Sequence, residues 1–294
     1  MKTYYKTEFY NYMVGISWFL LSLLISCLND VIAKYTTDNV HIWQVAFLRF
    51  FFGTVTLIPF MFFYGIKSFH TSRIFMHFIR GLILFFAISL WIYGLKIMPI
   101  STVTLVSFTI PIFILILAPI FLHEKIKLSL WVATIIGFLG VVLALHPDDF
   151  NFDYKALVLI LSAFLFATLD IINKKFIANE TMLSMLFYST AVTTVLAFPF
   201  ALINWGHIYS HELLLLFLLG AGSNLVLFCI LKAFQYVEAS TLAPFRYTEL
   251  IISIMLGYII FFEKPGMTTY IGALIIIPSS FYVVYTRAKE TKEI

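Results

Sequence analysis

Ten apolar segments of membrane-crossing length follow one another along the chain, with short polar connections between them. A transmembrane helix needs about 17–25 apolar residues, because the hydrocarbon core of a bilayer is about 30 Å thick and a helix rises 1.5 Å per residue. The pattern therefore predicts an all-α membrane protein with ten transmembrane helices. The predicted spans cover residues 13–33, 43–64, 75–95, 101–122, 129–145, 155–173, 183–204, 212–234, 241–262 and 268–286.

Composition supports a membrane protein over a soluble one. Charged residues make up 12% of the 294 residues, whereas a soluble domain carries about 25%. No stretch outside the spans is long enough to build a soluble core. The net charge of +4 lies in short loops without a basic face, so we expect no nucleic-acid partner. The first apolar run is too long for a cleavable signal and is interpreted as the first span.

The placement of Lys and Arg predicts the orientation. With a cytoplasmic N-terminus, twelve of the nineteen Lys and Arg residues fall in inner segments and four in outer segments, and the remaining three lie within or at the edges of spans. Cytoplasmic loops of membrane proteins carry the excess of positive charge. We therefore expect a multi-pass membrane protein with both termini in the cytoplasm.

An internal repeat relates the two halves of the sequence. A shift of 139 or 140 positions places similar residues on one another in both halves, namely Asp30 on Asp170, Gly81 on Gly220, Ser101-Thr102 on Ser240-Thr241 and Glu124-Lys125 on Glu263-Lys264. We expect one five-span repeat in residues 1–147 and a second in residues 148–294. Since five is odd, the second repeat enters the membrane from the opposite side. Inverted repeats are typical of secondary transporters, whose substrate sites lie near the membrane midplane between the halves.

The ninth span holds two charged residues that are candidates for substrate contact. Arg246 and Glu249 are three residues apart and share a helical face. Glu249 lies about 12 Å into the span, close to the bilayer centre. An ionisable group at that depth marks a substrate or ion pathway. The alternative is an internal Arg246–Glu249 pair that only holds the bundle together.

Other polar and aromatic residues within spans complete the candidate site. They can line a cavity, contact a ligand through an aromatic face or bind a substrate charge. For Asn224 the alternative is an interhelical hydrogen bond, and Asp30 and Asp170 are expected at the membrane interface. The further candidate substrate-binding residues are Trp18, Asn29, Arg49, Phe85, Ser89, Trp91, Asn224 and Phe228, with the last two expected to face Phe85, Ser89 and Trp91.

Motifs of enzymes and of ATP-driven pumps are missing from the sequence. The His-Glu pairs do not continue to the second His of a zinc-protease helix, and there is no phosphate-binding loop. We expect no metal, no cofactor and no ATPase subunit, and the lipid bilayer and a small-molecule substrate as partners. Three alternatives remain: an exporter of amino acids or drugs, an intramembrane lipid or prenyl transferase, and a structural membrane subunit.

Ten spans in two halves, with Ser-Thr opening and Glu-Lys closing the fourth span of each half, resemble the EamA group of the drug/metabolite transporter superfamily. The resemblance covers essentially the whole chain and implies a secondary transporter with alternating access. The segment Ala243–Glu249, the length and the phenylalanine-rich composition are similar to group members that take up S-adenosylmethionine. That similarity implies import of this zwitterionic, cationic metabolite across the bacterial inner membrane, in exchange for S-adenosylhomocysteine or a similar compound. It assigns no catalytic residue.

Overall fold

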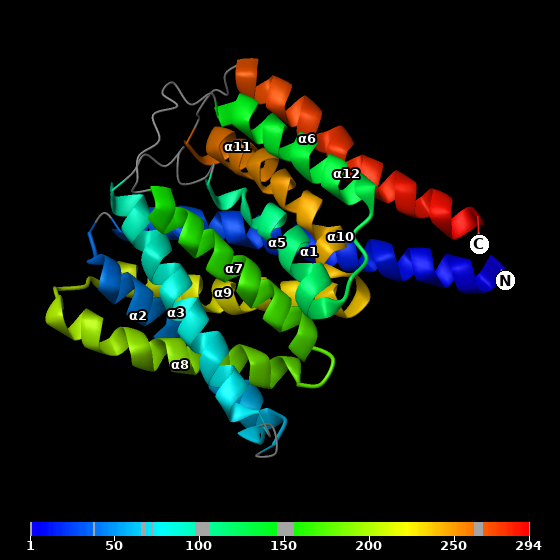
Figure 1. Cartoon of the computed structure of the whole chain (residues 1–294). Coiled ribbons are helices and arrows are strands. Elements are labelled where there is room, and N and C mark those ends of the chain that lie inside the picture. Colours follow the sequence, from blue (N-terminus) through cyan, green and yellow to red (C-terminus); the bar gives the residue numbers. More distant parts are fainter. Residues whose placement is uncertain are drawn as a thin grey trace.

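The computed structural model describes residues 2–37, 39–65, 69–71, 73–97, 106–145, 156–261 and 267–293, and the regular elements in these ranges are all helices (Figure 1). The motif residues Ser101, Thr102, Glu263 and Lys264 lie outside them. The helices are α1 (Lys2–Thr37), α2 (Ile42–Phe63), α3 (Ile74–Ile97), α5 (Ile110–Leu122), α6 (Leu128–Leu145), α7 (Ala156–Phe176), α8 (Met182–Ile203), α9 (Ser210–Tyr236), α10 (Ala239–Leu242), η2 (Ala243–Tyr247), α11 (Thr248–Phe261) and α12 (Met267–Glu293).

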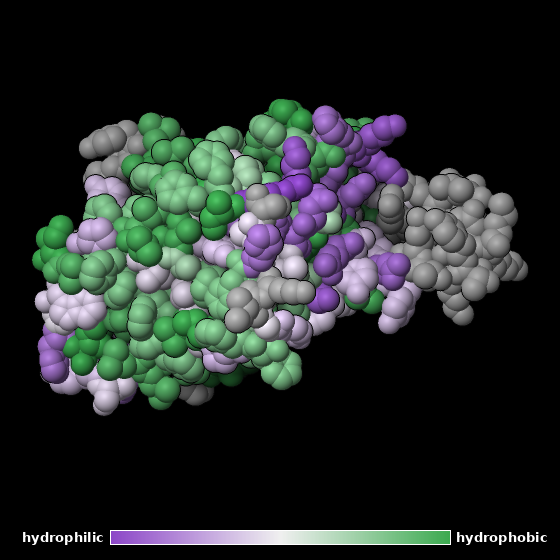
Figure 2. All heavy atoms as spheres, turned by 90° about the horizontal axis from the view of Figure 1, so that it is seen from below, coloured by the Kyte–Doolittle hydropathy of each residue, from purple (hydrophilic) through white to green (hydrophobic). Residues whose placement is uncertain are grey.

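Within the described ranges ten helices have 13 residues or more, and each coincides with a predicted span. Six of them are long and apolar enough to cross a membrane, and α5, α6 and part of α12 are shorter apolar helices. The start of α1 and the end of α12 lie at the same end of the bundle (Figure 1). Apolar residues cover most of the face in Figure 2, and hydrophilic residues gather toward one end. The fold is that of a multi-pass membrane protein.

The helix boundaries confirm the internal repeat. The bounds of α2 and α8 are offset by 140 positions at both ends. Helices α5 and α11 end 139 positions apart, and α6 and α12 begin 139 positions apart. The chain therefore consists of two repeats of five long helices.

Packing between the helices follows the same relation. Helix α1 packs on α9 as its counterpart α7 packs on α3, and the equivalent pairs α2–α8 and α6–α12 pack on each other. Thr54 and Thr194, which are 140 positions apart, share a hydrogen bond of 3.3 Å between their hydroxyls. An axis that relates the halves therefore passes between α2 and α8.

The equivalent glycines Gly81 and Gly220 mark matching helix crossings. A Cβ added at Gly81 would lie 2.5 Å from Val192 on α8, and one at Gly220 would lie 2.6 Å from the Arg49 carbonyl on α2. Without a hydrophobic driving force in lipid, membrane helices associate through close van der Waals packing, which small residues permit. These two glycines allow α3 and α9 to approach α8 and α2.

The ninth span differs from the prediction of one continuous helix. It consists of α10, the 3-10 segment η2 and α11. Pro244 stands at the start of η2, and proline has no backbone N–H to donate to an α-helical ladder. The break places Arg246 in the 3-10 segment and Glu249 in the first turn of α11.

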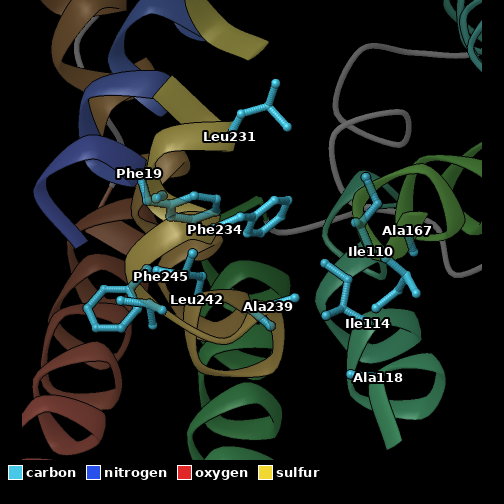
Figure 3. Close-up of a cluster of buried hydrophobic side chains, with 14 of the residues drawn as sticks. Phe19, Ile110, Ile114, Ala118, Ala167, Leu231, Phe234, Ala239, Leu242 and Phe245 are labelled. Carbon is cyan, nitrogen blue, oxygen red and sulfur yellow. The ribbon is translucent and has the colours of Figure 1, made fainter. Parts of the chain in front are cut away.

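Buried hydrophobic side chains join the halves beside this break. Figure 3 shows Phe19, Phe234 and Phe245 gathered near α10 and η2, with Ile110 and Ala167 on the neighbouring pair α5 and α7. All five belong to one cluster of buried residues. This cluster fixes η2 between helices of both repeats.

Candidate functional site

Arg246 forms a buried salt bridge with an aspartate of α7. Its Nη2 atom lies 2.8 Å from Asp170 Oδ2, and the two side chains are 15% and 11% exposed. Asp170, which we expected at the membrane interface, is thus packed within the bundle. The guanidinium forms its salt bridge with Asp170, and Arg246 is also an electrostatic neighbour of Glu249.

Glu249 links α11 to α1. Its backbone carbonyl accepts a hydrogen bond from Cys27 Sγ at 3.7 Å, and its carboxylate accepts one from the Ser26 hydroxyl. Its electrostatic neighbours include Asp30, one turn along α1 from Ser26, and Arg246. Glu249 is therefore directed toward the helices of the first repeat.

Asp30 and Arg49 bring two further charges from the first repeat. Asp30 is exposed and interacts electrostatically with Arg49. The Arg49 Nε atom donates to Ser223 Oγ on α9 at 2.8 Å. This bond directs the guanidinium into the bundle instead of toward the membrane surface.

These five residues form what we call the charge cluster: Asp30, Arg49, Asp170, Arg246 and Glu249. They come from α1, α2, α7, η2 and α11, and so from both repeats. Three carboxylates and two guanidiniums give a formal charge of −1. Charged side chains within membrane spans are rare and mark substrate pathways. A positively charged ligand would neutralise the cluster.

Two asparagines lie beside the cluster helices. Asn224 Nδ2 donates to the Gly53 carbonyl at 2.6 Å and to Thr56 Oγ1 at 3.1 Å, so the interhelical hydrogen bond predicted as the alternative is present. Within the described part of the chain, Asn224 Oδ1 and Asn29 Nδ2 have no hydrogen-bond partner. Buried polar atoms are normally satisfied, so both are available to a ligand.

The aromatic candidates fall into two groups. Trp18 and Phe228 meet edge to face, with ring centroids 5.9 Å apart. Phe85 instead packs on Phe200 of α8, and Trp91 packs on Phe166 of α7. Phe85, Ser89 and Trp91 belong to α3, which packs on α7 and α8 and contributes no residue to the charge cluster. The structure does not bring them to Asn224 and Phe228 as predicted.

A separate buried polar network lies between α3, α7 and α8 and was missed from the sequence. Arg80 is 1% exposed; its Nε donates to Asn173 Oδ1 at 2.9 Å, and its Nη1 lies 3.1 Å from His77 Nδ1. His77 Nε2 lies 3.6 Å from Glu180 Oε2. The signal was present, since an arginine deep in an apolar run needs partners, but Asn173 lies 93 positions away from Arg80.

Comparison with known proteins gives a consistent result. The family model described as "EamA-like transporter family" matches residues 13–146 and 154–285. An S-adenosylmethionine uptake transporter of Rickettsia conorii is 49% identical over 95% of both chains, and that of Rickettsia prowazekii has the same identity and coverage. A riboflavin transporter of Vibrio cholerae is 27% identical over 95% of both chains.

One solved crystal structure has the same fold. It is 16% identical and superposes with a TM-score of 0.77, covering 93% of this chain and 97% of its own. At that identity the likeness concerns the fold alone. The matched family is one of transporters, so this chain is not an enzyme and the intramembrane transferase is excluded. Across two repeats and nearly its whole length, the chain belongs to the EamA-like transporter family.

Proposed function

We propose that this protein imports S-adenosylmethionine across the inner membrane of a bacterium by alternating access. The observation that carries the proposal is the 49% identity, over 95% of both chains, to relatives named as S-adenosylmethionine uptake transporters. The more distant riboflavin transporters and a pseudopaline exporter share 22–27% identity.

The charge cluster supports this substrate chemically. S-adenosylmethionine carries a sulfonium, an ammonium and a carboxylate, and thus a net charge of +1. The formal charge of the cluster is −1, so the loaded site would be neutral. Since burying an unpaired charge is costly, a loaded site without net charge is easier to enclose within the membrane than a charged one.

Each part of the ligand has a matching group. The carboxylates of Glu249 and Asp30 suit the ammonium and the sulfonium. Asp170 already holds the guanidinium of Arg246 but not that of Arg49. Arg49 therefore suits the substrate carboxylate, because a guanidinium binds a carboxylate with two parallel hydrogen bonds. The Trp18–Phe228 pair offers aromatic faces for the adenine or the sulfonium.

The direct test is uptake of radiolabelled S-adenosylmethionine into bacterial cells that express the chain. Excess unlabelled S-adenosylhomocysteine, methionine or adenosine is added in parallel. Saturable uptake that only the homocysteine analogue blocks supports the proposal. Absence of uptake, in cells whose membranes contain the protein, refutes it and leaves an amino-acid or drug exporter of the same fold as the next candidate.

Exchange and orientation are further parts of the proposal. We propose that export of S-adenosylhomocysteine drives the import, with both termini in the cytoplasm. Vesicles preloaded with S-adenosylhomocysteine should then take up labelled S-adenosylmethionine faster than empty vesicles. Equal rates in the two preparations would exclude obligatory exchange.

A further inference from the structure

The connection between α9 and α10, at Val237 and Glu238, is held by two charged side chains from elsewhere in the fold. Glu124, just after α5, accepts hydrogen bonds from Ala239 N at 3.1 Å, from Ser240 N at 3.0 Å and from the Ser240 hydroxyl. Lys174 of α7 donates from Nζ to the carbonyls of Phe234 and Val237. The two side chains thus hold opposite ends of one short connection.

Both contacts satisfy backbone groups that helix ends leave free. The first N–H groups of a helix lack partners within it and favour a negative charge, whereas its last carbonyls favour a positive one. Glu124 lies at the start of α10 and Lys174 at the end of α9. Charge-assisted hydrogen bonds of this kind are stronger than neutral ones.

The backbone turns sharply at the residue before Glu124. His123, which caps α5, has a left-handed conformation with φ of 56°, a conformation that non-glycine residues rarely adopt. Glu124 follows this turn directly, and its carboxylate reaches Ala239 and Ser240. Glu124 belongs to the first repeat and Ser240 to the second, so its three bonds connect the repeats directly.

Packing around these contacts is tight. A Cβ added at Gly15 of α1 would lie 2.4 Å from Val237 Cγ2. A cavity of about 20 Å³ remains between Tyr12, Glu238, Thr241, Thr286 and neighbouring residues, which is room for one water molecule. Tyr12 lies toward the start of α1 and Thr286 toward the end of α12. The contacts therefore close the end of the bundle at which the termini lie.

We propose that Glu124 and Lys174 form a lock that holds this end of the transporter shut and opens in each transport cycle. Alternating access requires the two repeats to move relative to each other, and the Glu124–Ser240 bonds bridge them, so these bonds must break whenever this end opens. The hydrogen bonds of Lys174 lie within the second repeat, and its ammonium acts across the repeats through its electrostatic interaction with Glu124. The residues of the lock include members of the repeated Ser-Thr and Glu-Lys motifs, and neither Glu124 nor Lys174 belongs to the charge cluster.

The test is labelling of one cysteine behind the lock. Ala243 is 1% exposed, and Ala243→Cys is introduced into a chain whose native cysteines, Cys27 and Cys229, are replaced by alanine. Inside-out membrane vesicles are treated with a membrane-impermeant maleimide. Glu124→Gln and Lys174→Ala should each raise the labelling rate about tenfold, because each removes charge-assisted hydrogen bonds that favour the closed state.

A neighbouring residue supplies a matched control. Lys175→Ala changes an exposed lysine beside Lys174 and should not alter the rate. Ser240→Ala removes one hydroxyl and should raise the rate by a smaller factor, which keeps the test valid if Glu124→Gln does not fold.

Two results would overturn the lock. The first is a labelling rate that is the same in Glu124→Gln, Lys174→Ala, Ser240→Ala and the parent. The second is rapid labelling of the parent itself, since that would place Ala243 in an open passage. Because labelling requires no substrate, failure of the lock and failure of the proposed substrate are separate outcomes.

Discussion

Replacing Asp170 by asparagine should destabilise the fold more than any other single change in the charge cluster. The change leaves the Arg246 guanidinium without its partner in a place where the two side chains are only 15% and 11% exposed. At a charge separation of about 4 Å and an effective dielectric constant of about 20, the lost Coulomb energy is about 4 kcal/mol. Breaking a buried ion pair by removing one partner typically costs about 3–5 kcal/mol. We expect a loss of that size in the free energy of unfolding.

A double-mutant cycle measures the pair itself. Asp170→Asn, Arg246→Gln and the double variant are purified in mixed micelles and unfolded with increasing SDS. The double variant should be less destabilised than the sum of the single variants by about 2 kcal/mol or more, because it buries no unpaired charge. Asp30→Asn is the matched control: Asp30 is the exposed equivalent of Asp170 in the first repeat, and its loss should cost less than about 1 kcal/mol. A coupling energy below about 0.5 kcal/mol would refute the buried salt bridge as a stabilising contact.

Three further predictions concern transport and packing. Glu249→Gln should reduce uptake of labelled S-adenosylmethionine at least about tenfold with unchanged membrane insertion, since the amide keeps the size and loses the charge; wild-type uptake would assign Glu249 to the scaffold. Gly220→Ala should lower the unfolding midpoint in SDS, because its Cβ would meet backbone atoms at 2.6–2.7 Å, whereas Gly206→Ala, with its nearest atom at 3.5 Å, should not; equal midpoints would contradict the close crossing of α2 and α9. Trp18→Leu should raise the KM for uptake while Phe85→Leu leaves it unchanged, and the reverse result would place the substrate beside α3.

The helices were predictable because a bilayer imposes one length on every span. That constraint also made the repeat visible, because a shift of 139 or 140 positions aligns the spans of the first half with those of the second. The helix boundaries show the same shift. The break in the ninth span carried a local signal, Pro244, but the apolar pattern continues through it. Hydropathy alone therefore predicted a continuous helix where the backbone forms a 3-10 segment.

The partners of the charged residues were not predictable in this way. Asp170 and Arg246 are 76 positions apart, and one sequence does not show which distant helices pack together. Counting residues from the span ends placed Asp170 at the membrane interface, although α7 continues to Phe176, three residues beyond the predicted end. The equivalence of Asp30 and Asp170 under the repeat was the available signal. It indicated that the two aspartates occupy equivalent positions in the two repeats. It did not indicate that Asp30 interacts with Arg49 and Asp170 with Arg246.

The hydrogen bond between Thr54 and Thr194 across the axis bears on the energy levels of the transport cycle. If two identical repeats exchanged their conformations, the two end states would contain the same contacts and have the same free energy. Any preference for one state must then come from residues without a counterpart. Under the repeat, the position equivalent to Glu249 is occupied by Ile110, and the position equivalent to Arg80 is occupied by Leu219. Since about 1.4 kcal/mol changes an equilibrium constant tenfold, a few such residues suffice to set the resting state, and evolution can reverse that bias while leaving the helical framework unchanged.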